Sequence, residues 1–287
     1  MKLQLIVTLS ILLPVLASAR VIYGTDDRKD LYEIKDSLII DQIQSTATFS
    51  IRGLINPRSD GDFDISQTAL KDSILNVCPD TKFANQTAVG ACSATLISPR
   101  HLLTAGHCMP SQERCEEIYL AFGYHTYVAD ENLKTLAGKD VYRCKKLLVR
   151  KQDKIHDFAL IELDREVTDR TPVTLGINET MRKKETVRLI GYPDGLPSKV
   201  VSGGVIRKAD GFKFVSNLDA FKGNSGSGVF SEETGMMVGV LAAGEWDYRY
   251  DNARNCRVPT KCMDKECRGE DAGQISGIWP LIKDFLN

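Results

Sequence analysis

The sequence predicts an all-β fold made of many short strands, and three observations support this. Short apolar stretches rich in Val, Ile, Leu and Phe recur along the chain, roughly 8–12 residues apart. Gly, Pro, Asn and Asp punctuate these stretches, as in Gly191-Tyr-Pro-Asp-Gly195. Neither an internal repeat nor a low-complexity tract points to another architecture. A β-sandwich or a β-barrel is therefore expected.

The N-terminus has the pattern of an export signal. Lys2 provides a positive charge, an apolar run follows from Leu3 to Leu16, and Ala17-Ser18-Ala19 has the form of a cleavage site. We expect residues 1–19 to be a signal peptide cleaved near Ala19, with a retained membrane anchor as the alternative. The mature protein would then be secreted or periplasmic. Later apolar stretches are too short to span a bilayer, so no stable membrane association is expected.

The next segment, residues 20–44, is polar and charged, which suggests a propeptide or an N-terminal arm. A strand-like pattern begins at Thr46, so the main domain is placed at residues 45–287. Residues 64–75 carry apolar side chains at mixed helical spacings. They predict a short helix or an ordered insertion.

Further strands are expected throughout the rest of the chain. They lie at residues 94–98, 118–122, 158–163, 187–191, 200–206, 212–218, 227–230 and 237–242. The chain ends in a predicted short helix from Pro280 to Leu286, with Pro in its first turn.

Charge and cysteine content narrow the function classes. With 37 basic and 38 acidic residues, the chain gives no electrostatic argument for nucleic-acid binding. Eight cysteines in an exported chain favour disulfides. The alternative is a zinc module on Cys256, Cys262 and Cys267, which no histidine follows. We expect neither a metal nor a cofactor.

Three short motifs carry the chemistry. They are Leu103-Thr-Ala-Gly-His-Cys108, His156-Asp157-Phe-Ala-Leu-Ile161 and Gly223-Asn-Ser-Gly-Ser227. A serine hydroxyl is a weak nucleophile at neutral pH and needs an adjacent base. Histidine can take its proton because the imidazole titrates near physiological pH. Any one motif alone could be a structural turn, whereas the order His, Asp, Ser is far more specific.

With these motifs the chain resembles the chymotrypsin-like (trypsin-like) serine peptidases over residues 78–286. It is more similar to the bacterial secreted branch that includes glutamyl endopeptidases. That branch has Gly-Asn-Ser-Gly-Ser where the animal enzymes have Gly-Asp-Ser-Gly-Gly. The resemblance implies two packed six-stranded antiparallel β-barrels with the active site between them. It also implies a monomer that acts on protein or peptide substrates.

The resemblance assigns a role to each motif. Ser225 is the nucleophile, His107 the general base, and Asp157 the residue that orients His107. The backbone N–H groups of Gly223 and Ser225 form the oxyanion hole. A disulfide between Cys92 and Cys108 holds the strand and loop that carry His107.

The other six cysteines allow many pairings. We favour Cys115 with Cys144, which leaves Cys78 to pair among the three cysteines nearest the C-terminus.

Substrate specificity is predicted from the residues that the resemblance places in the primary pocket. Asp219 is expected at the pocket base, where a carboxylate favours Arg or Lys at the substrate P1 position. The wall runs from Leu241 to Gly244. Glutamyl endopeptidases have a histidine at the place of Leu241, so glutamyl specificity is not expected.

Several residues depart from the family pattern. Ala242 stands where relatives often have a Ser that bonds the triad Asp, and Ala243 where many have a Trp. Asn224 cannot form the ion pair that an Asp makes with the new N-terminus of animal zymogens. Arg20-Val-Ile-Tyr-Gly24 resembles an activation site but lies unusually far before His107. Whether residues 20–44 are removed is left open.

The sequence thus predicts a secreted serine endopeptidase that forms an acyl-enzyme on Ser225, with a preference for basic P1 residues. The alternative is a catalytically weak or inactive binding protein on the same fold.

Overall fold

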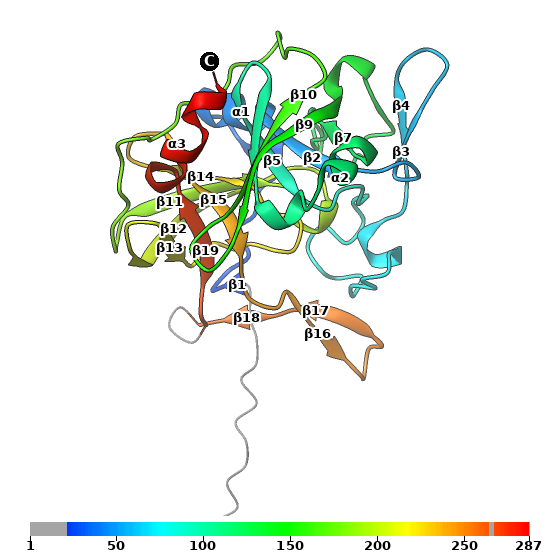
Figure 1. The fold of residues 1–287 in the computed structure, drawn as a ribbon. Helices are drawn as coiled ribbons and strands as arrows, with labels where there is room; N and C mark the ends of the chain where they lie inside the picture. The colour runs from blue at the N-terminus through cyan, green and yellow to red at the C-terminus, as the bar shows by residue number, and fades with distance from the viewer. Residues whose placement is uncertain (1–21, 264–266, 287) are drawn as a thin grey trace, which may run out of the picture.

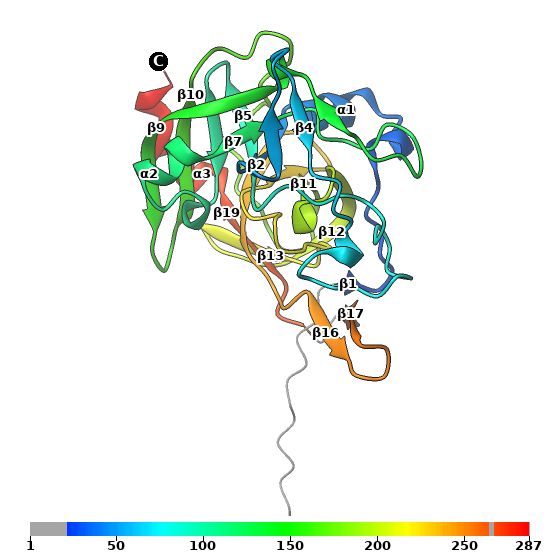
Figure 2. The ribbon, with the colours of Figure 1, turned by 90° about the vertical axis from the view of Figure 1, so that its right-hand side faces the viewer.

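The computed structural model describes residues 22–263 and 267–286 (Figure 1). The predicted signal peptide, with its cleavage site near Ala19, lies outside the described residues. Most of the described strands belong to two closed antiparallel barrels that pack against each other (Figures 1 and 2). Each barrel has six strands, so the predicted all-β, two-barrel fold is confirmed.

The first barrel is built from the N-terminal half of the chain. Its strands are β2 (Thr46–Ser50), β5 (Ser93–Ser98), β6 (His101–Thr104), β7 (Tyr119–Ala121), β9 (Val141–Gln152) and β10 (Asp157–Leu163). Around the barrel they follow the order β10-β6-β5-β2-β7-β9, and the pairing of β9 with β10 closes it.

The second barrel follows in the C-terminal half. Its strands are β11 (Thr186–Gly191), β12 (Lys199–Ala209), β13 (Lys213–Ser216), β14 (Gly228–Ser231), β15 (Met237–Ala243) and β19 (Glu270–Gln274). Their order is β11-β12-β13-β19-β15-β14, closed by β11 with β14. The last strand, β19, was not predicted from the sequence.

In strand β10, alternate side chains point into two different hydrophobic cores. Ala159 and Ile161 point into the first barrel, whereas Phe158 and Leu160 point into the layer between the barrels. Because all four are fully buried, a slip by one residue would exchange the two cores. This alternation fixes the register of the strand that begins with Asp157.

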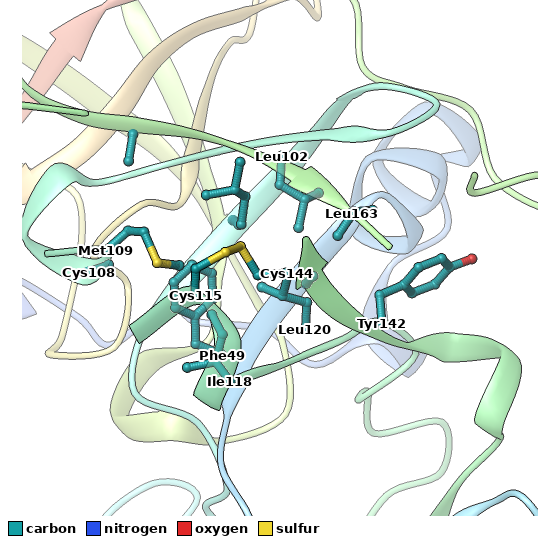
Figure 3. Packing of buried hydrophobic residues seen from close by; sticks show 14 of the residues in the cluster. Phe49, Leu102, Cys108, Met109, Cys115, Ile118, Leu120, Tyr142, Cys144 and Leu163 are labelled. Carbon is teal, nitrogen blue, oxygen red and sulfur yellow. A yellow bond between two sulfur atoms is a disulfide. The ribbon is translucent and has the colours of Figure 1, made fainter. Parts of the chain in front are cut away.

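The core of the first barrel is closely packed (Figure 3). Phe49, Leu102, Leu120 and Leu163 from four different strands meet inside it, beside the disulfide of Cys115 and Cys144. Burying an aliphatic or aromatic side chain contributes about 1.5–3 kcal/mol each. The core therefore gives a rigid support to the loops that carry His107 and Asp157.

Helices are few and short. They are α1 (Ser37–Gln44), α2 (Gln112–Glu117) and α3 (Ile275–Ile282), with 3-10 turns η1 (Leu31–Glu33), η2 (Leu70–Asp72), η3 (Gly106–Cys108), η4 (Gly138–Asp140), η5 (Pro193–Gly195) and η6 (Lys283–Phe285). The predicted C-terminal helix is present but begins at Ile275, and Pro280 lies inside it rather than in its first turn. Ile275, Ile278 and Ile282 recur at helical spacing and pack between the barrels, which explains the earlier start.

The predicted element at residues 64–75 is an ordered insertion. It contains the end of strand β4 (Phe63–Ile65) and the turn η2, whose Leu70 is buried. Strand β4 forms a small sheet with β3 (Ile55–Pro57) and β8 (Thr135–Leu136).

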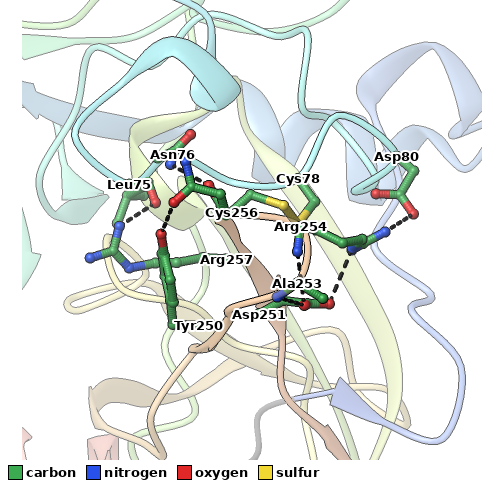
Figure 4. The surroundings of a disulfide bond; sticks show 11 residues. Leu75, Asn76, Cys78, Asp80, Tyr250, Asp251, Ala253, Arg254, Cys256 and Arg257 are labelled. Carbon is green, nitrogen blue, oxygen red and sulfur yellow. Dashed lines mark hydrogen bonds and ion pairs between the residues drawn. A yellow bond between two sulfur atoms is a disulfide. The ribbon is translucent and has the colours of Figure 1, made fainter.

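A hairpin that the sequence did not predict extends away from the second barrel (Figures 1 and 2). Its strands are β16 (Tyr248–Asp251) and β17 (Cys256–Pro259). The Cys78–Cys256 disulfide ties it to the long connection between β2 and β5 of the first barrel (Figure 4). Arg257 reinforces this link, because its guanidinium donates to the Leu75 carbonyl at 2.6 Å.

All eight cysteines are paired. Cys92–Cys108 and Cys115–Cys144 form as predicted, and the remaining two disulfides are Cys78–Cys256 and Cys262–Cys267. The late cysteines are therefore not the ligands of a zinc module. No helix among the described residues is long and apolar enough to cross a membrane.

Candidate active site

His107 and Asp157 form a closely bonded pair at the edge of the first barrel. The Asp157 Oδ2 atom lies 2.7 Å from His107 Nδ1, and Oδ1 accepts a hydrogen bond from the His107 backbone N–H at 2.9 Å. One carboxylate therefore fixes both the ring and the main chain of the histidine. With Nδ1 protonated toward Asp157, Nε2 is left as a proton acceptor.

The approach of these two residues depends on Gly106. A Cβ at this position would lie 2.3 Å from the Lys151 carbonyl oxygen and 3.0 Å from Asp157 Oδ1. Any larger residue would push the carboxylate or strand β9 away. The glycine in the first motif is thus required by the geometry of the pair.

Ser225 lies on the loop before β14 and is held against the first barrel. Its carbonyl accepts a hydrogen bond from the Ser93 N–H at 2.8 Å, and the next residue, Gly226, donates to the Leu241 carbonyl at 2.7 Å. Ser93 follows Cys92, whose disulfide partner Cys108 follows His107. The loop of Ser225 and the loop of His107 therefore share one support.

Within the described part of the chain, Ser225 Oγ makes no hydrogen bond, to His107 or to any other group. In ligand-free peptidases such bonds are often long and shorten when substrate binds. Ser225 also lines a pocket, which places it where a substrate could reach it.

Gly223 adopts a conformation that only glycine tolerates well. Its φ is +95°, and a Cβ would lie 2.4 Å from the Tyr192 carbonyl oxygen. The Gly223 carbonyl accepts a hydrogen bond from Ser93 Oγ at 2.8 Å. The turn is therefore fixed from both sides.

The backbone N–H groups of Gly223 and Ser225 point away from the hydrogen bonds that hold this loop. The carbonyls of Lys222 and Asn224 are occupied, by the N–H groups of Asp194 and Ser227 respectively. Because a trans peptide points its N–H opposite to its carbonyl, the N–H groups of Gly223 and Ser225 face away from these partners. Neither has an acceptor among the residues that the structure describes.

A pocket of about 100 Å³ opens beside Ser225. It is lined by Ala220, Phe221, Lys222, Ser225, Leu241, Ala243, Gly244, Glu245, Asp247 and Glu270. Leu241 and Gly244, which were expected to form the wall, are both among these residues. The lining of this small space thus includes three acidic residues and one lysine.

Asp219 is not part of the pocket lining, contrary to its expected position. Its buried carboxylate accepts hydrogen bonds from the backbone N–H groups of Tyr23 at 2.8 Å and Asp27 at 3.3 Å. These donors turn it toward the N-terminal segment. Burial nevertheless raises the pKa of Asp219 to about 7, and the negative charges of Asp26 and Asp27 act in the same direction.

Glu270, on the unpredicted strand β19, is the buried acid of the pocket. A Cβ on Gly244 would lie 1.7 Å from Glu270 Oε2, so the carboxylate packs directly against Gly244. Burial raises the pKa of Glu270 well above its ordinary value. Sequence reasoning missed this residue because it lies in no motif. Its only signal is alternation, since Glu270, Ala272 and Gln274 are all buried on one side of the strand.

Ala242 lies near Asp157 but has no hydroxyl that could donate a hydrogen bond to its carboxylate. Ala242 and Asp157 line a second cavity of about 180 Å³. Both carboxylate oxygens of Asp157 are instead satisfied by His107.

Potential metal ligands come together at one place next to the catalytic pair. Within the described residues, the Cys92, Cys108 and His107 side chains form the one group of potential ligand atoms, which lie within 4.8 Å of one another. Both sulfurs belong to a disulfide, so they are not available as thiolate ligands.

Comparisons with known proteins agree with this geometry. A family model described as a trypsin-like peptidase domain matches residues 92–240. A comparison with curated protein sequences finds no match.

Solved structures share the fold at low sequence identity. A Glu endopeptidase in complex with MPD aligns with a TM-score of 0.55 and 17% identity, over 92% of this chain and 98% of that one. The Vibrio cholerae VesB protease gives 0.53 and 12%, over 93% and 68%. The human heparin binding protein gives 0.55 and 13%, over 92% and 96%. At these identities the likeness concerns the fold alone.

Proposed function

Because the chain belongs to the trypsin-like peptidase family, we propose that it is a serine endopeptidase that hydrolyses peptide bonds through an acyl-enzyme on Ser225. The observation that carries the proposal is the His107–Asp157 pair, bonded at 2.7 Å, beside a serine loop with two free N–H groups.

In the first step, Ser225 Oγ attacks the carbonyl carbon of the substrate while His107 Nε2 accepts the hydroxyl proton. Asp157 stabilises the resulting imidazolium through the Nδ1 hydrogen bond. The N–H groups of Gly223 and Ser225 bind the oxyanion. Each donor of this kind contributes about 2.7–4 kcal/mol to lowering the barrier.

In the second step, His107 gives the proton to the leaving amine, and the C–N bond breaks to leave an ester on Ser225. Water then enters, loses a proton to His107 Nε2 and attacks the ester. Collapse of the second tetrahedral intermediate returns the proton to Ser225 Oγ and releases the acid product.

We propose a preference for Arg or Lys at P1, with Glu270 in the role first expected of Asp219. Glu245, Asp247 and Glu270 outnumber Lys222 in the pocket lining. A cationic side chain would favour the ionised form of Glu270 and so oppose the effect of burial on its pKa. An acidic P1 side chain would instead be repelled by these carboxylates. Position 241 is Leu rather than the His of glutamyl endopeptidases, which also disfavours an acidic P1 residue.

We further propose that the enzyme acts outside the cytoplasm, in the extracellular space or the periplasm. Four disulfides are typical of an oxidising compartment. The signal-peptide pattern of residues 1–19 supports the same location.

Hydrolysis of a peptide library that varies only at P1 tests the proposal. We expect cleavage after Arg and Lys by the wild type and none by Ser225→Ala. The matched control is Ser202→Ala, which removes a hydroxyl from an exposed position of β12 and should retain full activity. Cleavage that survives in Ser225→Ala would contradict the proposal.

The alternative is a binding protein that uses the same fold without catalysis. One solved structure of similar fold bears the name of a heparin binding protein, and Ala242 and Ala243 depart from the peptidase pattern. A folded wild type that cleaves no member of the library would favour this alternative.

A further inference from the structure

The N-terminal segment that the sequence left open as a propeptide is joined to the substrate pocket. We call residues 22–33 the N-terminal strap. Strand β1 (Ile22–Tyr23) pairs in parallel with β18 (Lys261–Cys262), which follows the unpredicted hairpin. Further along, Lys29 exchanges two backbone hydrogen bonds of 2.9 Å with Val200 of β12. The strap is thus attached at both ends to the half of the molecule that forms the pocket.

A buried ion pair anchors the strap. Lys199 Nζ lies 2.6 Å from Asp30 Oδ1, and both side chains are almost completely buried. The same ammonium donates to Gln86 Oε1 and to the Pro197 carbonyl, each at 2.8 Å. All three protons of the ammonium are therefore used. Removing one partner would leave a buried, uncompensated charge, which is strongly destabilising.

Arg28 packs the strap against Phe221, a residue of the pocket lining. Its side chain is fully buried and lies over the Phe221 ring, 3.9 Å from the centroid. Phe221 is itself one of the residues that line the pocket. Ile22 packs in the same small cluster with Phe221. A shift of the strap would therefore be transmitted to the pocket wall.

Asp219 ties the strap to the loop that carries Ser225. Its carboxylate accepts from the strap N–H groups of Tyr23 and Asp27. Asn224, where animal zymogens have an Asp for their new N-terminus, is buried and accepts a hydrogen bond from Ser227 Oγ at 3.3 Å. Among the described residues, the loop is therefore held through the backbone N–H groups of Tyr23 and Asp27.

Tyr23 reaches the pocket acid itself. Its hydroxyl donates to Glu270 Oε1 at 3.3 Å, while the Arg207 guanidinium lies 4.7 Å from the centroid of its ring. Burial raises the pKa of the Tyr23 hydroxyl, so the group stays protonated and remains a donor. A donor on one carboxylate oxygen leaves the other, Oε2, beside Gly244, and both residues line the pocket.

We propose that the strap is a permanent part of the enzyme, in which Asp219 and Tyr23 are positioning residues: Asp219 orders the Ser225 loop and Tyr23 orients Glu270 toward the substrate. The proposal rests on the proposed peptidase function. It implies that the pocket is ordered without a proteolytic cut within residues 22–44.

Tyr23→Phe tests the second role, with Tyr32→Phe on the exposed part of the strap as the matched control. Loss of the hydroxyl removes one hydrogen bond to a carboxylate, so we expect the ratio of kcat/KM for Arg over Leu at P1 to fall about tenfold. The pH midpoint of that ratio should also move upward, because the donor favours the ionised form of Glu270. Tyr32→Phe should change neither quantity.

Asp219→Ala tests the first role by hydrogen exchange, which needs no catalysis. We expect exchange to increase together in residues 22–27 and in the loop at 219–225. An increase confined to residues 22–27 would overturn the role of Asp219, and an unchanged ratio and midpoint in Tyr23→Phe would overturn that of Tyr23. A wild type that cleaves no peptide would instead show that the proposed function has failed, and the positioning roles would fall with it.

Discussion

The two sides of the active site are built in different ways. On the first barrel, His107 and Asp157 are bonded directly, and each lies in a short motif at the end of a strand. On the second barrel, Tyr23 bonds Asp219 and the pocket residue Glu270, which lie 196 and 247 residues from it along the chain. The His107–Asp157 pair is thus specified by short local motifs, whereas the pocket side is assembled from segments far apart in the sequence. Changes at the His107–Asp157 pair should therefore affect rate, and changes in the pocket lining and its supports should affect choice of substrate.

The largest effect is expected from Asp157→Asn. The amide keeps the size of the side chain but favours the wrong tautomer of His107, so kcat should fall about 10⁴-fold. Selectivity at P1 should stay the same, because the pocket does not contain Asp157. Steady-state kinetics on Arg and Leu substrates measure both, with exposed Asp153→Asn as the control. A change in the Arg-to-Leu ratio of kcat/KM would contradict the expectation that Asp157 affects rate without affecting selectivity.

Gly223→Ala should lower kcat by about 10²–10³-fold, the loss expected for one oxyanion donor. A methyl group would be 2.4 Å from the Tyr192 carbonyl in a backbone of φ +95°, so the turn must move. Gly211→Ala is the matched control, since its Cβ would meet no atom within 4 Å. Comparison of kcat with a thermal unfolding curve separates the loss of a donor from the loss of the fold. Full activity in a folded Gly223→Ala protein would rule out this loop as the oxyanion site.

Glu270→Gln should reduce the Arg-to-Leu ratio of kcat/KM about 10–100-fold while leaving kcat on the Leu substrate nearly unchanged. The substitution removes the charge and keeps the acceptor for Tyr23. Exposed Glu233→Gln should have no effect. If Asp219→Asn lowers the ratio more than Glu270→Gln does, the assignment of the pocket acid returns to Asp219.

The smallest effect concerns pH. Burial raises the pKa of Asp247 from 3.8 to about 7. Between about pH 4 and 7, the Asp247 carboxyl is therefore still protonated in the folded protein but already ionised in the unfolded chain. Because the folded state binds more protons there, the free energy of unfolding decreases as pH rises through that range. Binding of a cationic P1 side chain should instead become stronger as pH rises, because Asp247 becomes negatively charged.

We expect the Arg-to-Leu ratio to rise severalfold through about pH 7, and Asp247→Asn to flatten part of that rise. Use of a ratio cancels any pH dependence of the catalytic step, which is common to both substrates. A ratio that is constant from about pH 5 to 8 would show that the pocket carboxyls do not contact the substrate.

Much of the first side could be predicted because its signals are local. Many strands of both barrels follow from short apolar stretches bounded by turn residues, although β19 was not predicted, and the His, Asp and Ser motifs identify their loops. The Cys92–Cys108 disulfide follows from the family resemblance, and it forms.

The second side could not be predicted in the same way. Glu270 has no motif around it, and its function depends on burial beside Gly244. Asp219 was assigned from its spacing to Ser225, but spacing does not reveal that Tyr23 and Asp27 would supply its hydrogen bonds. The buried pair of Lys199 with a carboxylate 169 residues away is a similar case, because each partner alone resembles an exposed surface charge. Such contacts appear only when the chain is folded.

The most direct test of the central proposal is covalent labelling of the purified, mature protein with a fluorophosphonate, followed by peptide mapping. We predict one adduct per molecule, located on Ser225, with none in Ser225→Ala and a greatly slowed reaction in Asp157→Asn. A folded wild-type protein that acquires no adduct, or acquires it on another residue, would contradict the assignment of Ser225 as the nucleophile.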